Sequence, residues 1–414
     1  MTQSVILSKA ARERLLLPGH AFSAMAADGH EMAPLRALGI MPVPSGGDRG
    51  YNTEGDVLTQ TIDGRNLNDV WQEFQASLGM HNEARTRLID LLTFPVNNPV
   101  EDVPILDHED FEEASEFGEP KGIGGGRFWS MGFSFKWYDL AIRYTWKYLA
   151  EATAAQVEAL NNMAIEADNR LVFNQVLRSI FNNNTRVADI RGHAYNVYPF
   201  YNGDAAAPPP QYKNYTFTED HDHYLTSGAT TVDSGDLDTM ATHIRHHGHG
   251  TAAHGGQLVL LIPEDGAEAA AIRAFRVANG DSYDFIPAQN QPPFLLPSNT
   301  GGIQGGQPAQ FWQGLQVLGR YGPWIIVEES YIPSGYMVGL STGGEVSAAN
   351  PVGLREHANA GLRGLQLVKG RSEDYPLIDS FYRRGFGTGI RQRGAGVVMQ
   401  VTESAEYAIP ADYQ

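Results

Sequence analysis

The chain has 414 residues, which is enough for two or three packed units, and 42% of them are hydrophobic, as expected of a protein with a buried core. Its formal net charge of −18 and its lack of any Lys/Arg run argue against sequence-specific DNA binding, because such binding needs a basic surface that displaces phosphate counterions. The absence of cysteine excludes disulfides, thiolate catalysis and cysteine–zinc sites.

The first 65 residues are predicted to be an irregular arm, since Gly, Pro and Asp are scattered through 41–50. Residues 1–14 contain no signal-peptide core, and no stretch approaches the ~20 apolar residues that cross a bilayer. We therefore expect a protein made in a cytosol, without a membrane partner. Residues 67–92 show the apolar spacing of a helix, which Pro95 and Pro99 are expected to end.

Residues 97–135 are predicted to form a long hairpin that projects from the body. Acidic residues crowd 107–119, glycines follow at 122–126, and residues 128–135 alternate large apolar with small side chains, which is the period of a strand. Such an arm orders many residues with little burial of its own. We expect it to serve a purpose outside the subunit.

A helix over 153–183 is the clearest predicted element. Thr153 and Gln156 have the spacing of a capping box, and apolar residues recur at helical spacing from Leu160 to Phe181. Asparagines at 182–184 are expected to end the helix, since Asn tolerates the left-handed conformation. At 1.5 Å per residue this spine would be about 45 Å long.

The sequence after the spine predicts an α/β region. Residues 194–232 are rich in Tyr and Pro and are predicted to be a long loop. Ser234 is expected to cap a helix that Gly248 closes, and residues 264–277 are expected to form an Ala-rich helix. Short strands are expected at 258–262, 324–327, 336–340, 365–368, 387–390 and 396–401.

The strands at 324–327 and 336–340 flank the turn 332–335, and we expect them to form one strand–turn–strand unit. No repeat of fixed period is present, which argues against solenoids and propellers. The predicted class is therefore α+β.

The order of arm, hairpin, spine helix, α/β lobe and final β segment resembles the major capsid proteins of tailed bacteriophages, with the Hong Kong 97 fold. Three short stretches of the amino-acid sequence resemble capsid proteins of phages that infect actinobacteria: Glu166–Phe173, Val327–Tyr336 and Phe386–Arg391. None of these strings is a chemical motif, so the resemblance rests on several matches in order.

The resemblance implies a division of the chain into the regions of that fold. These would be an N-terminal arm at 1–65, a helical segment at 66–96, an extended loop at 97–135, a peripheral domain at 136–185 containing the spine helix 153–183, an axial domain at 186–361 with an inserted loop at 194–232, and a return to the peripheral domain at 362–414.

The resemblance also implies function and partners. The chain would assemble into hexamers and pentamers of an icosahedral head that encloses double-stranded DNA, in the cytoplasm of a bacterial host, and would reside in the virion. Expected partners are a portal protein at one vertex, a separate scaffolding protein, and in some phages a decoration protein. Residues 1–65 lack the charged helical pattern of a fused scaffold, so no cleaved domain is expected. Two alternatives stay open: an encapsulin-like nanocompartment shell, and a histidine-metal hydrolase.

Two groups of polar residues could hold a metal ion, since neutral imidazoles at one-turn spacing can chelate zinc or nickel. The alternative is a polar helix end beside a solvated loop. There is no HExxH motif, and the two groups need not meet in space, so no metal, cofactor or catalytic residue is predicted. The first group is His243, His246 and His247, with His249 and His254 beyond, and the second is Asp220, His221, Asp222 and His223.

One covalent possibility is implied by the family, some of whose members link a lysine of the extended loop to an asparagine of a neighbouring subunit with help from a buried glutamate. Lys121 would be the lysine, Asn350 or Asn359 the partner, and Glu356 the glutamate. The alternative is that Lys121 is a solvated residue at the hairpin tip, and we do not predict these residues as a site.

Two other sequence patterns give weaker evidence of a functional site. Gly385, Gly387 and Gly389 lack the strand-before, helix-after context of a dinucleotide loop and are predicted to form turns. The acidic run at Asp110, Glu112 and Glu113 is expected to be a solvated face. No motif of an enzyme is left, and the chain is predicted to be structural.

Overall fold

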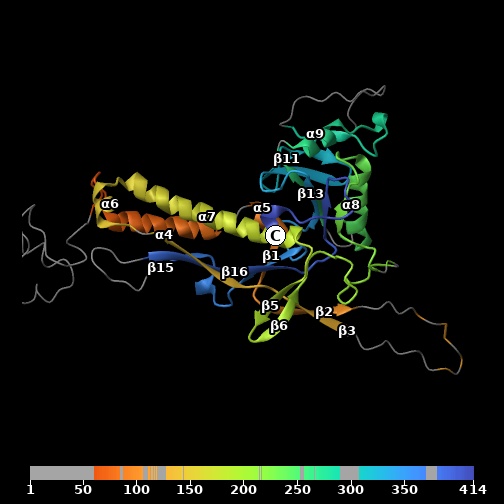
Figure 1. Cartoon of the computed structure of the whole chain (residues 1–414), viewed down its shortest axis with the longest axis horizontal. Helices are drawn as coiled ribbons and strands as arrows, with labels where there is room; N and C mark the ends of the chain where they lie inside the picture. Colours follow the sequence, from red (N-terminus) through yellow and green to blue (C-terminus); the bar gives the residue numbers. More distant parts are fainter. Residues whose placement is uncertain are drawn as a thin grey trace, which may run out of the picture. The chain divides into compact units, whose positions relative to one another are not determined.

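A computed structural model describes the chain from residue 60 onward, and Figure 1 shows it whole. Residues outside the description are 1–59, 84–86, 106–110, 112, 115, 117, 119–126, 143, 214, 216, 252–255, 265, 290–306 and 370–379. The chain divides into two compact units, which are taken separately below. The first comprises Met1–Ala84, Tyr138–Asp168 and Gly364–Arg384, and the second Arg85–Trp137, Asn169–Arg363 and Gly385–Gln414.

The first unit is built on two helices that lie side by side (Figure 1). Val70 and Phe74 of α4 (Leu67–Glu83) share a buried apolar cluster with Val157 of α7 (Ala154–Phe181). The short helix α6 (Trp146–Glu151) adds Leu149 to this cluster. The predicted helix over 67–92 is therefore present as α4 and a second helix, α5 (Arg87–Leu92), which ends before Pro95 as expected.

A buried charged group also ties this unit together. Asp168 of α7 accepts a hydrogen bond from Arg384 through its Oδ2, which also lies 2.9 Å from His81 Nε2 of α4. Asn82 of α4 is joined to the backbone of Leu365, the first residue of β15 (Leu365–Lys369). Polar contacts therefore fix α4 against both α7 and β15.

The spine helix is confirmed. The Thr153 hydroxyl accepts a hydrogen bond from the Gln156 backbone N–H at 3.4 Å, and the Gln156 carboxamide accepts one from the Thr153 N–H at 2.9 Å, which is the reciprocal capping box. The helix α7 ends at Phe181, directly before the expected asparagines. Its first part lies in the first unit and its second part in the second.

The second unit contains a mixed eight-stranded sheet in the order β10-β11-β12-β8-β13-β17-β7, with β9 paired to β11. Two helices, α8 (Ser234–His246) and α9 (Ala267–Ala274), pack on it through Leu237, Met240 and Ile272 (Figure 1). The strands of the sheet are β7 (Tyr224–Thr226), β8 (Gln257–Pro263), β9 (Phe285–Pro287), β10 (Phe311–Trp312), β11 (Leu315–Tyr321), β12 (Trp324–Glu329), β13 (Tyr336–Thr342) and β17 (Gly396–Gln400).

The strands expected at 324–327 and 336–340 are present as β12 and β13, with the turn between them in the chain, but they do not pair with each other. Strand β8 lies between them, parallel to β12 and antiparallel to β13. All five residues Leu258–Ile262 of β8 are buried, so this apolar strand takes the central place in the sheet. The turn at 332–335 therefore connects two strands that are not adjacent in the sheet.

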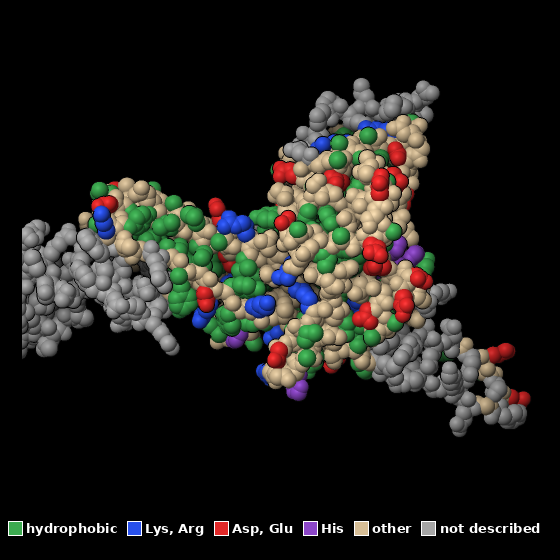
Figure 2. Space-filling view, in the orientation of Figure 1, with side chains coloured by type: hydrophobic (Ala, Val, Ile, Leu, Met, Phe, Trp, Pro, Cys, Tyr) green, Lys and Arg blue, Asp and Glu red, His purple; other side chains and the backbone are tan. Residues whose placement is uncertain are grey.

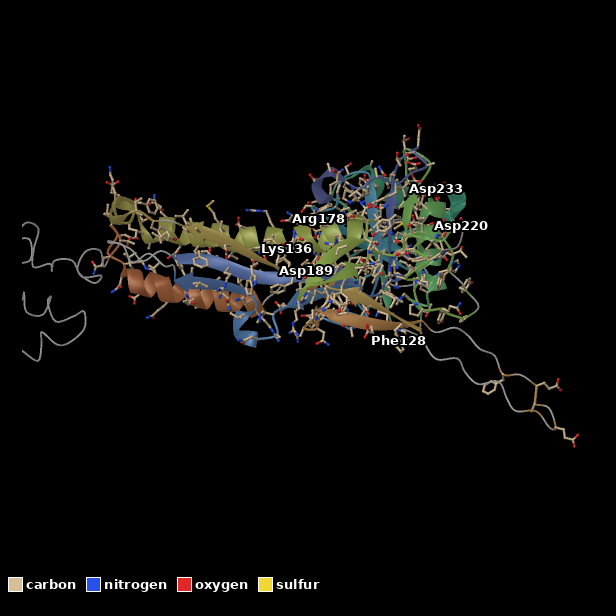
Figure 3. The ribbon with its side chains drawn as sticks, turned by 60° about the horizontal axis from the view of Figure 1, so that its bottom comes forward. Phe128, Lys136, Arg178, Asp189, Asp220 and Asp233 are labelled. Atoms are coloured by element: carbon tan, nitrogen blue, oxygen red, sulfur yellow. The ribbon has the colours of Figure 1, made fainter. Side chains whose placement is uncertain are left out.

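The predicted hairpin is present where the structure describes it. Strand β2 (Val100–Ile105) pairs antiparallel with β3 (Arg127–Gly132), and Ile105 lies opposite Arg127 at the end of the ladder. Between them, Lys121, Gly124–Gly126 and Asp110 lie outside the described residues. Figure 3 shows Phe128 on β3, and its side chain is 65% exposed.

Further strands of the second unit surround the base of this hairpin. Strand β1 (Thr93–Val96) pairs parallel with β14 (Val352–Glu356), and β14 pairs antiparallel with the second half of β16 (Ser380–Ile390). The first half of β16 belongs to the first unit, where it pairs with β15. Strands β5 (Arg186–Ile190) and β6 (His193–Val197) pair with each other in the second unit, and β4 (Lys136–Ile142), most of which belongs to the first unit, pairs with β16.

Three local predictions need correction. The stretch 194–232 is not wholly loop, because it contains most of β6 and all of β7. Asp233, not Ser234, caps α8, forming a capping box with Asp236. The helix expected over 264–277 is α9, which ends at Ala274 and is followed by the 3-10 turn Val277–Asn279. The mixed α+β class itself is confirmed.

No helix among the residues that the structure describes is long and apolar enough to span a bilayer.

Candidate metal centre and assembly segments

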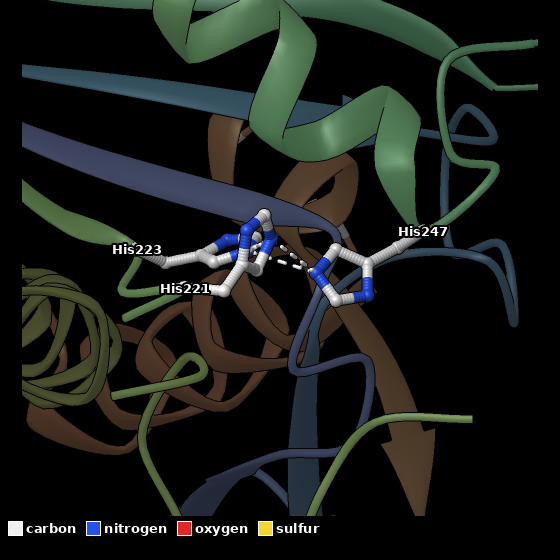
Figure 4. Close-up of side chains that lie close together, drawn as sticks. All are labelled: His221, His223 and His247. Atoms are coloured by element: carbon white, nitrogen blue, oxygen red, sulfur yellow. Dashed lines mark hydrogen bonds between the residues drawn. The ribbon is translucent and has the colours of Figure 1, made fainter. Parts of the chain in front are cut away.

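Three histidines from two distant parts of the chain converge in the second unit. His221 and His223 directly precede β7, and His247 is the C-cap residue of α8. Figure 4 shows their rings facing one another. The Nε2 atoms lie 3.1 Å apart for His221 and His247, 3.3 Å for His221 and His223, and 2.9 Å for His223 and His247. The structure thus joins the two histidine groups that the sequence left separate.

His223 is held in place on every side. Its backbone N–H donates to the Tyr201 carbonyl at 2.8 Å, and its own carbonyl accepts from the Val398 N–H of β17 at 2.9 Å. Its ring Nδ1 lies 2.6 Å from the Gly396 carbonyl oxygen. Because a carbonyl only accepts, Nδ1 carries the proton, and Nε2 of the neutral ring presents its lone pair to the cluster.

The second ring is fixed by packing. Phe217 stacks on His247 with ring centroids 3.8 Å apart. Gly394 lies directly against the His247 ring, and a methyl group at that position would overlap it. The lack of a side chain at Gly394 therefore makes room for the His247 ring, and nothing in the sequence around Gly394 indicates this role.

The surroundings keep all three imidazoles neutral. Burial lowers the pKa of His221 to about 4, with the nearby His243 and His246 adding to the effect. Burial also lowers the pKa values of His223 and His247 well below their usual range, and the neighbouring histidines add to this. Neutral imidazole is the form that binds metal ions.

The other candidates lie beside the cluster and not in it. The His243 ring stacks on His221 with centroids 4.8 Å apart, but its Nδ1 bonds the Thr239 carbonyl at 2.9 Å. His246 stacks on Tyr215, 4.3 Å away. The helical trio His243, His246 and His247 therefore does not form the converging set. His254 lies outside the described residues.

The acidic members of the second group do not converge with the rings either. The Asp222 carboxylate accepts from the Tyr224 backbone N–H at 2.9 Å, which makes it a turn residue at the start of β7, and burial raises its pKa. Figure 3 shows Asp220 on the segment ahead of β7. Among the histidine, aspartate and glutamate side chains that the structure describes, only those of His221, His223 and His247 bring three possible ligand atoms close enough together to hold one metal ion.

The crosslink candidates occupy different environments. Asn350 is fully buried, and its Nδ2 lies 2.8 to 3.1 Å from the carbonyl oxygens of Asp90, Thr93 and Gly344. Its amide is therefore committed to holding three backbone segments. Asn359 is exposed and caps a 3-10 turn through the Gly361 N–H at 3.0 Å. Glu356 is buried at the end of β14.

The glycines predicted as turns are strand residues. Gly385, Gly387 and Gly389 all lie in β16, and side chains there would overlap the segment that follows the hairpin. A methyl group on Gly387 would collide with the Ser134 carbonyl oxygen. These glycines therefore permit a close approach of two backbones. The strand expected at 387–390 is confirmed, and the turn prediction for the same glycines is wrong.

No family model matches the chain, and no curated protein sequence matches it. A solved structure from Mycobacterium phage Patience is 45% identical, with a TM-score of 0.69, and the match covers 90% of this chain and 98% of that one.

More distant matches have low TM-scores. The mature capsid of bacteriophage PhiM1 is 8% identical with a TM-score of 0.46, and the capsid of the cyanophage P-SCSP1u is 9% identical with a TM-score of 0.44. Each of these two covers 77% of this chain and 88% of its own.

Proposed function

The chain belongs to the family of tailed-phage major capsid proteins with the Hong Kong 97 fold, and we propose how its segments build the shell. It is a structural protein of the phage head that assembles with copies of itself into hexamers and pentamers around the double-stranded DNA genome. The observation that carries this is the 45% identity to the mycobacteriophage structure over 98% of that chain. The encapsulin-like and hydrolase alternatives lack a match of this kind.

The described surface supports a role in assembly. Large apolar side chains are exposed on the first unit at Ile62, Met80 and Met163, each more than 60% accessible. Figure 2 shows hydrophobic side chains gathered over the region of α4 and α7. Burying such side chains between subunits supplies favourable free energy beyond that of each subunit's own core.

The hairpin of β2 and β3 would reach over a neighbouring subunit. Its two-stranded ladder carries exposed Phe128, so an apolar ring is available for a partner surface. Extended arms of this kind convert weak contacts into high avidity, because each subunit is held at several places at once.

The regional assignment follows the family. Residues 1–65 would be the N-terminal arm, 66–96 a helical segment, and 136–185 with 362–414 the peripheral domain. Residues 186–361 would be the axial domain, whose loops meet around the fivefold and sixfold axes, with 194–232 as an elaboration. Support comes from α7, which lies where the spine is expected, and from the large sheet, most of whose strands fall within 186–361.

Assembly would take place in the cytoplasm of the bacterial host. A portal protein would occupy one vertex, a separate scaffolding protein would guide assembly, and a decoration protein could bind the finished shell. No proteolytic removal of an N-terminal domain is proposed.

Electron microscopy of the purified chain tests this function. Expression with its scaffolding protein is expected to give closed icosahedral shells, and a monomer or small oligomer as the only product would contradict it. Shells that recruit a cargo enzyme, and no portal or DNA, would point to the encapsulin-like alternative instead.

A further inference from the structure

We propose that His221, His223 and His247 form a structural binding site for a divalent transition-metal ion, Zn²⁺ in the first place, which ties the inserted segment before β7 to the end of α8 and to β17. This goes beyond shell formation and does not depend on it.

The spacing of the nitrogens fits a metal ion. In a tetrahedral zinc site with Zn–N bonds of about 2.0–2.1 Å, two ligand nitrogens are about 3.3 Å apart. The three Nε2 pairs here lie 2.9, 3.1 and 3.3 Å apart, slightly tighter than that geometry. Three imidazoles are a ligand set that suits zinc, copper or nickel, and they leave one position for water.

Hydrogen bonds among the three rings cannot satisfy the cluster. His223 Nε2 has one lone pair, since its proton is on Nδ1, yet both His221 and His247 face it. That lone pair can accept a well-formed hydrogen bond from only one of them. A cation replaces this conflict by bonding all three lone pairs at once.

The surroundings of the site favour a metal ion over protons. Histidines that bind zinc usually donate their other ring N–H to a carbonyl or carboxylate, which fixes the orientation of the ring. The hydrogen bond from His223 Nδ1 to the Gly396 carbonyl is of this kind. His247 sits at the C-terminus of α8, where the helix dipole favours positive charge. His223 is fully buried and His247 nearly so, so protonating them would be costly.

The effect of the ion would be mechanical. His221 and His223 belong to a segment rich in Tyr and Pro, His247 ends a helix, and the carbonyl that orients His223 belongs to β17. An ion bound here would fasten three separate stretches of the second unit, in a chain without disulfides.

The test uses assembled particles of the full chain, treated with EDTA and then titrated with Zn²⁺ by calorimetry, with metal content measured after dialysis. We expect one tightly bound ion per subunit. His221→Gln is expected to weaken binding at least tenfold. The matched control His243→Gln, which changes the ring stacked on His221 but no converging nitrogen, is expected to leave binding unchanged.

The contrary results are equally clear. Wild-type particles that take up no Zn²⁺, or a His221→Gln variant that binds as wild type, would overturn the site. An equal loss in both variants would assign the binding to surface histidines. If His221→Gln fails to assemble, Co²⁺ added to wild-type particles decides: the strong visible absorption of a tetrahedral ion is expected, displaced by Zn²⁺, and a pale octahedral spectrum would overturn the proposal.

Discussion

Asn350 is a fully buried residue whose side chain forms hydrogen bonds to several backbone and side-chain groups. Its Oδ1 accepts from the Thr342 hydroxyl at 2.9 Å and from the Gly343 N–H at 3.1 Å, while its Nδ2 serves carbonyls near the end of α5 and in β1. Replacing it with alanine would leave several of these buried groups without a partner, and each such group costs about 1–3 kcal/mol.

We therefore expect Asn350→Ala to lower the free energy of unfolding by on the order of 3 kcal/mol or more. The measurement is urea denaturation of unassembled subunits followed by tryptophan fluorescence. Asn359→Ala is the control, since this exposed side chain makes one capping contact and its loss should cost about 1 kcal/mol or less. Equal midpoints for the two variants would contradict the role assigned to Asn350.

The histidines show what sequence reasoning can find at this scale. The high density of histidines in the sequence indicates both groups of possible metal ligands, and helical spacing predicts that His243, His246 and His247 act together. The structure instead pairs His247 with two residues on a segment more than twenty positions away. Which rings meet depends on how β7 docks on β17, and this pairing has no local signal.

At the scale of elements, β16 shows how glycine governs packing. Gly387 pairs with Arg355 of β14, and its open face receives the backbone of Ser134. Because the obstacle is main chain, no side-chain rotation can make room for a methyl group.

Gly387→Ala is expected to destabilise the subunit by about 1–3 kcal/mol or more and to reduce the yield of assembled shells. The check is the thermal midpoint of unassembled protein by scanning fluorimetry. Gly361→Ala is the matched control, because a methyl group there would have only the Asn359 carboxamide at 3.5 Å as a neighbour. A thermal midpoint for Gly387→Ala equal to that of the control would show that the two backbones can separate at no cost.

Elements dominated by local signals were predicted well from the sequence. The spine helix was found because its capping box and its periodicity act within a few residues. Strands β8, β12 and β13 were all expected as strands, but the place of β8 between the other two was not, because β8 comes from more than sixty residues earlier in the chain. Gly387 and Gly389 were expected both in a strand and in turns, because a glycine in a turn and one under a crossing backbone look alike in sequence.

At the scale of the whole molecule, the hairpin should be dispensable for folding and required for the shell. Ile105 and Arg127 lie opposite each other, so residues 106–126 can be replaced by an Asn-Gly turn without changing the register of β2 and β3. The buried cluster on the large sheet lies elsewhere, and the cluster that includes Trp129 and Met131 of β3 keeps these residues, so both should be unaffected.

We expect the shortened chain to remain folded by circular dichroism and to form no stable shells, or shells that dissociate at lower denaturant concentration than the wild type. The shortened hairpin keeps the same two strands, so a loss of assembly would be assigned to the tip. Shells of wild-type stability would show that the tip contributes nothing to contacts between subunits.

The position of β17 in the sheet has a consequence for the order of events during synthesis. This strand lies between β13 and β7, so β7 has no place in the sheet until residues 396–400 have been made. In a chain still emerging from the ribosome, β17 and β7 are therefore missing from the large sheet. The contact between His223 and the Gly396 carbonyl is missing as well. Only a chain synthesised past residue 400 can present the finished sheet of the second unit, so we expect shorter nascent chains to be unable to join a growing shell.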